Sequence, residues 1–198
     1  MHPWVHGGWA LDVGKSHFIL EVLRRRNEFF TPAPKKMVYV YGIWQEAFEN
    51  IKDVEFVRGV DGLSGMDFNS KQPSLLVIDD LMEELSSNRE LSILFTREMH
   101  HKSITVFFLV QNLYKQGKSM RDVALNCQVL ILFKSPRDIE QLKVLGRQLG
   151  IKDLNKAYEE SIKQRYGYLL INLQPSIPDA LRLQTNLFDQ HRKIFLKK

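Results

Sequence analysis

The stretch Leu75–Met82, which reads LLVIDDLM, decides the fold of this chain. Its first four residues are all apolar, and such a run is typical of a strand that is buried on both faces of a parallel sheet. Two carboxylates, Asp79 and Asp80, follow at the point where the strand ends. Open α/β sheets bind their ligands at the carboxyl ends of their strands. The acidic pair therefore predicts a cation or a reacting water at this place.

Strand-like and helix-like segments alternate along the rest of the chain, which predicts an α/β fold with a mainly parallel central sheet and flanking helices. With 198 residues, we expect a single domain over 1–198, with an atypical N-terminal segment over 1–13 and a basic tail over 189–198. The predicted strands are 37–41, 54–57, 75–78, 104–110, 129–133, 168–173 and an edge strand at 181–187. The predicted helices are 16–26, 87–99, 120–125, 135–149 and 152–164.

Composition narrows the class of protein. The chain has a net charge of +5 and a pI near 9.3, values compatible with a polyanionic partner. Cys127 is the only cysteine, so the chain holds no internal disulfide and no cysteine metal site. No apolar run reaches the ~18–20 residues that span a bilayer. We therefore expect a soluble intracellular protein without a membrane partner.

A second motif, Gly14-Lys15-Ser16, precedes an apolar helical pattern. Phosphate-binding loops use backbone N–H groups at a helix N-terminus, a lysine on the outer phosphates and a hydroxyl that holds Mg²⁺. These three residues have the correct identity and order for binding ATP and Mg²⁺. The complete pattern also has a glycine at position 9, where this chain has Trp9. The competing interpretation is a chance tripeptide at a helix start.

The acidic pair complements this motif. Together, the two stretches match the Walker A and Walker B elements of an ATP-hydrolysing domain. Asp79 would hold Mg²⁺, and Asp80 would polarise the attacking water. Gln111 follows the next predicted strand and would contact the γ-phosphate or orient that water. The structural alternatives are a carboxylate pair that caps the next helix and an amide that makes a turn.

Cations gather after Gln111. Lys115, Lys118 and Arg121 lie in one predicted loop and the start of a helix, where they could contact nucleic-acid phosphates or a neighbouring subunit's nucleotide. A solvated charge cluster is the alternative interpretation. Arg97, Arg121 and Arg137 are candidate arginine fingers, and the sequence does not select among them.

Three segments of the chain carry a resemblance to a known family: LLVIDDLM (75–82), TREMHHKSITVFFLVQNLYKQGKSMRDVALNCQVLILFKSPRD (96–138) and YLLINLQPSIPDALRLQTNLF (168–188). They resemble the DNA-packaging ATPases of Polinton/Maverick elements and related viruses, in the FtsK–HerA branch of P-loop ATPases. The resemblance covers roughly Gly14 to Phe188. The long middle segment is its specific part, since many families share the Walker elements.

The resemblance implies a three-layer P-loop NTPase fold and an ATP-driven homo-oligomeric ring that moves double-stranded DNA into a capsid, with a capsid or portal protein as partner. Lys15 and Ser16 match the Walker A residues, and Asp79 and Asp80 match the Walker B pair. Gln111 matches the polar sensor of the following strand. Residues 1–13 depart from the family pattern, which has an apolar first strand and a glycine-rich loop there.

Two other hypotheses remain. One is a catalytically impaired remnant of such an ATPase, suggested by Trp9 in place of the glycine. The other is a DNA-binding or assembly module without enzymatic activity, suggested by the basic pI and the Lys115–Arg121 loop.

Overall fold

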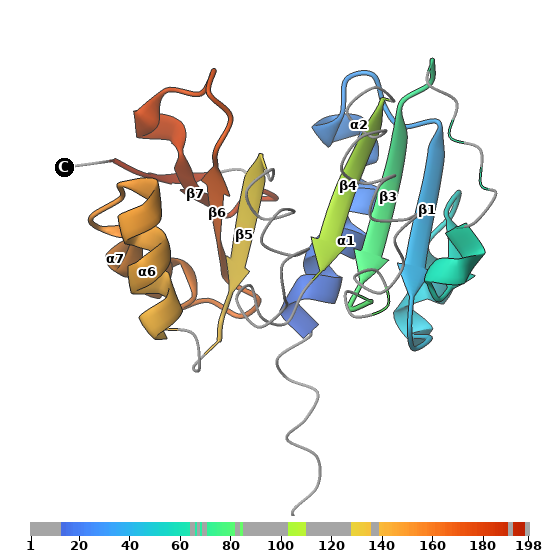
Figure 1. Cartoon of the computed structure of the whole chain (residues 1–198), viewed down its shortest axis with the longest axis horizontal. Helices are drawn as coiled ribbons and strands as arrows, with labels where there is room; N and C mark the ends of the chain where they lie inside the picture. The colour runs from blue at the N-terminus through green and yellow to red at the C-terminus, as the bar shows by residue number, and fades with distance from the viewer. Residues whose placement is uncertain are drawn as a thin grey trace, which may run out of the picture. The chain divides into compact units, whose positions relative to one another are not determined.

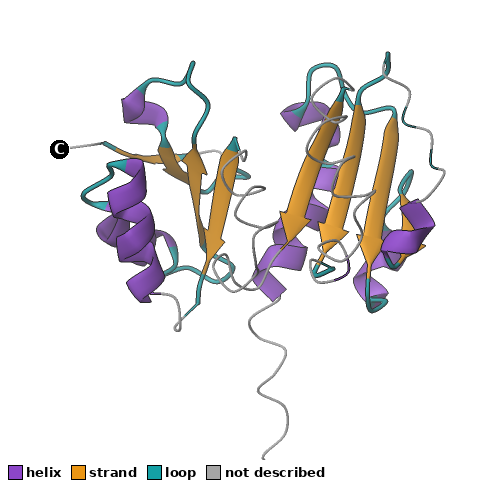
Figure 2. Ribbon diagram, viewed as in Figure 1, coloured by secondary structure: helices purple, strands orange, loops and turns teal. Residues whose placement is uncertain are grey.

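The computed structural model describes residues 13–63, 66, 68, 71–81, 84, 103–109, 128–135, 139–189 and 192–196. The chain divides into two compact units. Unit 1 comprises Met1–Ile19 with Asn126–Lys198, and unit 2 comprises Leu20–Leu125. The predicted α/β class is confirmed, since unit 2 holds a parallel sheet and unit 1 holds an antiparallel sheet, both with helices (Figure 2).

Unit 2 is built on a four-stranded parallel sheet in the order β2-β1-β3-β4 (Figure 1). The strands are β1 (Lys36–Tyr41), β2 (Glu55–Arg58), β3 (Ser74–Asp79) and β4 (Ile104–Leu109). All four confirm predicted strands, and no end of a strand differs from its predicted position by more than one residue. Strand β3, which carries the apolar run Leu75–Ile78, therefore lies between two parallel neighbours.

The burial of β3 explains its composition. Its residues Leu75, Leu76, Val77 and Ile78 are all completely buried. Leu76 and Ile78 belong to an apolar core on one face of the sheet, which also contains Val38 and Val40 of β1. Since neighbouring residues of a strand point to opposite faces, Leu75 and Val77 are buried on the other face. A strand that is covered on both sides carries no alternating polar residues.

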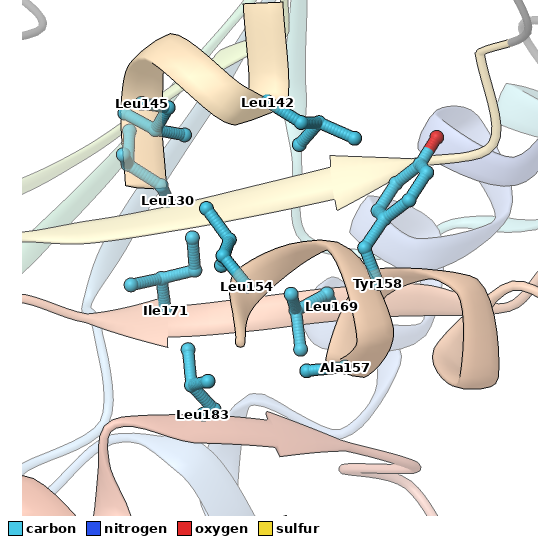
Figure 3. Packing of buried hydrophobic residues seen from close by; sticks show 9 residues of the cluster. All are labelled: Leu130, Leu142, Leu145, Leu154, Ala157, Tyr158, Leu169, Ile171 and Leu183. Atoms are coloured by element: carbon cyan, nitrogen blue, oxygen red, sulfur yellow. The ribbon is translucent and has the colours of Figure 1, made fainter. Parts of the chain in front are cut away.

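Unit 1 is built on a four-stranded antiparallel sheet in the order β5-β6-β7-β8. The strands are β5 (Val129–Phe133), β6 (Tyr168–Asn172), β7 (Leu183–Thr185) and β8 (Lys193–Phe195). Helices α6 (Ile139–Leu149) and α7 (Leu154–Ser161) bury their apolar side chains against this sheet (Figure 3). The core consists of Leu130, Leu142, Leu145, Leu154, Ala157, Tyr158, Leu169, Ile171 and Leu183.

The remaining helices are short apart from the first. Helix α1 spans Val13–Arg24 and is followed by α2 (Arg26–Phe29). Single 3-10 turns occupy Glu46–Asn50 (η1), Val60–Leu63 (η2) and Asp179–Leu181 (η4). None of the helices described in these ranges is long and apolar enough to cross a membrane.

Three predictions about the fold need correction. The late strands were expected in the parallel sheet, but β5 to β8 form an antiparallel sheet of their own. The link from β6 to β7 contains only the 3-10 turn η4, and a parallel crossover needs a dozen or more residues. Strand β7 was predicted as an edge strand, but Lys193–Phe195 of the predicted basic tail forms β8 and pairs with its outer side. Helix α1 begins at Val13, three residues earlier than predicted.

Of the later helix boundaries, the end of α6 agrees with the prediction and those of α7 do not. Gly150 ends α6 with φ of +66°, the left-handed conformation that glycine adopts at helix ends. Helix α7 is shorter at both ends than the predicted 152–164. The predicted helices 87–99 and 120–125 lie outside the described residues. The single-domain prediction over 1–198 stays a prediction.

Candidate functional site

The carboxyl edge of the parallel sheet carries the acidic pair. The register aligns Tyr41 with both Arg58 and Asp79, and Asp79 with Leu109, so that the last residues of all four strands meet at one edge. Asp79 is the final residue of β3, and Asp80 follows it directly. This edge is where parallel sheets bind their ligands. The sequence-based placement of Asp79 and Asp80 at a strand end is therefore confirmed.

Asp79 is held by a buried tyrosine. The hydroxyl of Tyr39 donates a hydrogen bond of 2.7 Å to Oδ2 of Asp79. Tyr39 pairs with Val77 in the sheet, and Asp79 lies two residues beyond Val77, so both side chains are on the same face. Burial raises the pKa of the Tyr39 hydroxyl, and the negative charge of Asp79 raises that pKa further. Tyr39 is therefore a neutral donor to this carboxylate at physiological pH.

Asp80 has an unusual backbone conformation. Its φ is +56°, in the left-handed region that Asp and Asn enter more readily than other non-glycine residues. Its backbone N–H donates to the carbonyl oxygen of Leu109 at 3.0 Å, which extends the β3–β4 ladder by one residue. The side chain is exposed. The chain thus turns at Asp80, and the second carboxylate is accessible to solvent at the sheet edge.

Aromatic side chains surround Tyr39. Its ring centroid lies 4.8 Å from that of Phe48 and 5.5 Å from that of Phe56, and Phe48 and Phe56 stack at 4.9 Å. Trp44, which follows β1, contacts Phe48 at 5.4 Å and Phe56 at 5.6 Å. We call Tyr39, Tyr41, Trp44, Phe48 and Phe56 the aromatic cluster. Within this cluster, Phe48 and Phe56 hold the Tyr39 ring in place.

The predicted Walker A residues lie in unit 1. Gly14, Lys15 and Ser16 form part of the first turn of α1 and are half-buried. The first turn of a helix presents N–H groups without intrahelical partners, which suits an anion. A Cβ atom at Gly14 would lie 3.2 Å from Cδ1 of Phe133, so close packing inside unit 1 also favours glycine there. Asp79 and Asp80 belong to unit 2, and each group is described within its own unit.

The other predicted site residues lie outside the described part of the chain. They are Arg97, Gln111, Lys115, Lys118, Arg121 and Arg137. Their proposed roles as sensor, arginine fingers and DNA contacts stay predictions.

The donors on these segments suit a hard cation. Mg²⁺ prefers oxygen ligands and commonly takes only one or two carboxylates, with water and substrate phosphates completing its shell. In unit 2, Asp79 offers a carboxylate that is hydrogen-bonded to Tyr39. In unit 1, taken by itself, Ser16 offers a hydroxyl in the first turn of α1. Among the described residues, no group of three or more His, Cys, Asp and Glu side chains could hold a metal by itself. The two carboxylates at the edge of the parallel sheet are oxygen ligands of the kind that Mg²⁺ prefers.

Tyr39 is the site residue that sequence reasoning missed. The signal was present, since Tyr39 lies in the middle of the apolar strand Met37-Val38-Tyr39-Val40. A buried tyrosine hydroxyl needs a hydrogen-bond partner, and the acidic pair ends the neighbouring strand. The strand order that makes β1 and β3 neighbours was needed to connect the two facts.

Comparisons with protein-family models, with curated proteins and with solved structures gave no match.

Proposed function

We propose that this chain is a P-loop ATPase with a three-layer fold that drives packaging of double-stranded DNA into a capsid. The observation that carries the proposal is the acidic pair at the carboxyl end of a fully buried parallel strand, with Asp79 anchored by Tyr39 and Asp80 exposed beside it. The Gly14-Lys15-Ser16 turn at the start of α1 supports it, as do the sequence segments that resemble packaging ATPases.

Each residue has a defined role in this proposal. Lys15 neutralises the outer phosphates, and the Ser16 hydroxyl and Asp79 would hold Mg²⁺, which screens the phosphate charge when it is bound. Asp80 accepts a proton from the attacking water or orients it, a role that suits an exposed carboxylate at the sheet edge. Gln111 contacts the γ-phosphate, and Arg97, Arg121 or Arg137 acts on a neighbour's nucleotide in a homo-oligomeric ring. Lys115 and Lys118 contact DNA phosphates.

The test is Mg²⁺-dependent ATP hydrolysis with and without duplex DNA. Asp80→Asn is the informative variant, because asparagine tolerates the left-handed backbone and removes only the charge. We expect a decrease in kcat of about 10²–10⁴-fold, the usual contribution of a positioned acid or base. Lys15→Ala should abolish turnover.

Asp53→Asn is a matched control. Asp53 also has a positive φ, of +62°, and is exposed, but it precedes β2 and so lies near the opposite end of that strand. Its carboxylate pairs with Arg26, so the substitution removes one exposed ion pair, whose effect on stability is small. Turnover that survives both Lys15→Ala and Asp80→Asn, or that falls equally in Asp53→Asn, would contradict the proposal.

A specific observation favours a second candidate, a remnant that keeps the fold but does not bind nucleotide. Gly14 is accounted for by its close approach to Phe133, without any phosphate. Equilibrium dialysis with a non-hydrolysable ATP analogue separates the two candidates. Binding that is lost in Lys15→Ala supports the ATPase, and no binding by the unaltered chain supports the remnant.

A further inference from the structure

The Tyr39 hydroxyl bonds to a carboxylate at the sheet edge, although the tyrosine itself is completely buried in the sheet. The oxygen-to-oxygen distance is 2.7 Å, and a hydrogen bond to a charged acceptor is stronger than one between neutral groups. The bond engages Oδ2, and a carboxylate oxygen can accept more than one hydrogen bond or ligand. Tyr39 therefore restricts the rotation of the Asp79 carboxylate without excluding a cation from it.

We propose that Tyr39 is the positioning residue that sets the Asp79 carboxylate for a divalent cation. The inference rests on the proposed function, because it takes Asp79 as a cation ligand. Hydrogen-bond partners of metal-ligating groups fix the orientation of the ligand, and their loss typically costs 10–100-fold in metal affinity. Tyr39 fits this role, because it contacts Asp79 and lies on the neighbouring strand rather than on a loop.

The aromatic cluster gives Tyr39 the rigidity that positioning requires. Phe48 and Phe56 both contact its ring, and Phe48 is itself almost fully buried. The backbone of Tyr39 is held on both sides, since β1 pairs with β2 and with β3. The ring is therefore fixed, and its hydroxyl oxygen lies within hydrogen-bond distance of Asp79.

The cluster also reaches the surface beside the same edge. Trp44 is 47% exposed and Ile43 is 80% exposed, and both follow the carboxyl end of β1. The Trp44 ring contacts Tyr41, Phe48 and Phe56. Trp44 thus packs on the solvent side of the cluster, against the same Phe48 and Phe56 rings that contact Tyr39.

The experiment measures cation binding directly. Mn²⁺ binding is followed by electron paramagnetic resonance, with Mn²⁺ alone and with Mn²⁺ plus ADP, for the unaltered chain and for Asp79→Asn, Tyr39→Phe and Tyr41→Phe. Tyr39→Phe keeps the ring and its packing and removes only the hydroxyl. Tyr41→Phe is the matched control, because it removes a hydroxyl from the same strand and the same face.

We expect Asp79→Asn to abolish binding in at least one arm, Tyr39→Phe to weaken it by roughly 10-fold or more, and Tyr41→Phe to leave it unchanged. Replacement of Tyr39 by 4-aminophenylalanine, which restores a donor at the same place, should recover most of the affinity. This recovery is a readout that a merely structural role of the hydroxyl would not produce.

Two outcomes would overturn the inference. One is Mn²⁺ binding by Tyr39→Phe equal to that of the unaltered chain. The other is no difference between the unaltered chain and Asp79→Asn in both arms, since no cation would then depend on Asp79. The ATPase assays are read separately: Mn²⁺ binding that depends on Tyr39, without Lys15-dependent turnover, would refute the proposed function and leave the positioning role intact.

Discussion

The hydroxyls of buried tyrosines have different hydrogen-bond partners in the two units. In the antiparallel unit 1, the Tyr158 hydroxyl donates to the Phe133 carbonyl and accepts from the Ser135 N–H, both at 2.9 Å. The Tyr168 hydroxyl accepts from the Leu187 N–H at 2.7 Å. In the parallel unit 2, the Tyr39 hydroxyl donates instead to a carboxylate that the sequence motif singles out.

The three tyrosine hydroxyls differ in the kind of group that they contact. The hydroxyls of Tyr158 and Tyr168 bond to backbone groups that folding would otherwise leave without water. The need to satisfy these buried polar groups accounts for both sets of bonds. The Tyr39 hydroxyl is also buried and needs a partner, but its partner is a half-buried carboxylate rather than a backbone group. Under the proposed function, the bond from Tyr39 orients a cation ligand, whereas the bonds of Tyr158 and Tyr168 serve the fold. The predictions below test this division, beginning with the largest expected effect.

The two cores should each depend on their central strands. Leu76→Ala in β3 and Leu169→Ala in β6 each remove a completely buried side chain, and each should lower the free energy of unfolding by about 2–5 kcal/mol. Chemical denaturation measures the loss, and hydrogen exchange shows which amides lose protection. We expect the amides of β1, β3 and β4 to respond to Leu76→Ala, and those of β5 and β6 to respond to Leu169→Ala. A loss below about 1 kcal/mol in either variant would contradict the packing described here.

Tyr168→Phe should affect stability and leave any nucleotide chemistry unchanged. It removes the acceptor for the Leu187 N–H, at a cost of about 1–3 kcal/mol near neutral pH. Burial raises the pKa of Tyr168 to about 12. A tyrosine whose pKa is raised by folding stabilises the native state below the unfolded value of about 10, and this contribution disappears as the pH rises through the folded value.

The difference in unfolding free energy between the unaltered chain and Tyr168→Phe should therefore narrow between pH 10 and 12. Urea denaturation at a series of pH values provides the measurement. A difference that stays constant up to pH 12 would show that the hydroxyl does not ionise differently in the two states.

The smallest effect concerns the strand at the outer edge of unit 1. Lys193 of β8 and Lys163 both donate hydrogen bonds to Glu160, the first at 2.8 Å, and together they lower the pKa of Glu160 to about 2. A lowered carboxyl pKa stabilises the folded state above about pH 4.5 and loses that contribution as the pH falls toward 2. Lys193→Ala should leave stability near neutral pH almost unchanged, because the pair is exposed.

The stability of Lys193→Ala should differ from that of the unaltered chain at acid pH, in the range below pH 4.5. Its stability should fall less steeply between pH 4.5 and 2 than that of the unaltered chain, as followed by circular dichroism during acid titration. Identical acid limbs would mean that Lys163 alone holds Glu160.

Much of the fold was predictable because its signals are local. The apolar runs of β1, β3, β4 and β5 predicted each strand, and Gly150 predicted the end of α6, because periodicity and chain termination depend on neighbouring residues. The pairing of strands depends on residues distant in sequence. The antiparallel sheet of unit 1 and the outer strand β8 were therefore missed, the latter because Lys193–Phe195 is only three residues long.

The candidate site was predictable in part for the same reason. Asp79 and Asp80 were placed correctly because they directly follow a strongly marked strand. Tyr39 was missed because its role depends on β1 and β3 being neighbours. The left-handed conformation of Asp80 was not predicted either, since one residue at a strand end gives no periodic signal.

The backbone at Asp80 also limits what natural variation can do at this position. Among acidic residues, aspartate is better suited than glutamate to φ near +56°, and asparagine and glycine are the substitutions that the conformation admits most easily. Lineages that keep the carboxylate for chemistry should therefore retain aspartate. Lineages that have lost the chemistry should drift to asparagine or glycine rather than to alanine, serine or valine. The residue that relatives of this chain carry at position 80 would then indicate whether selection has acted on the charge or only on the backbone conformation of the turn.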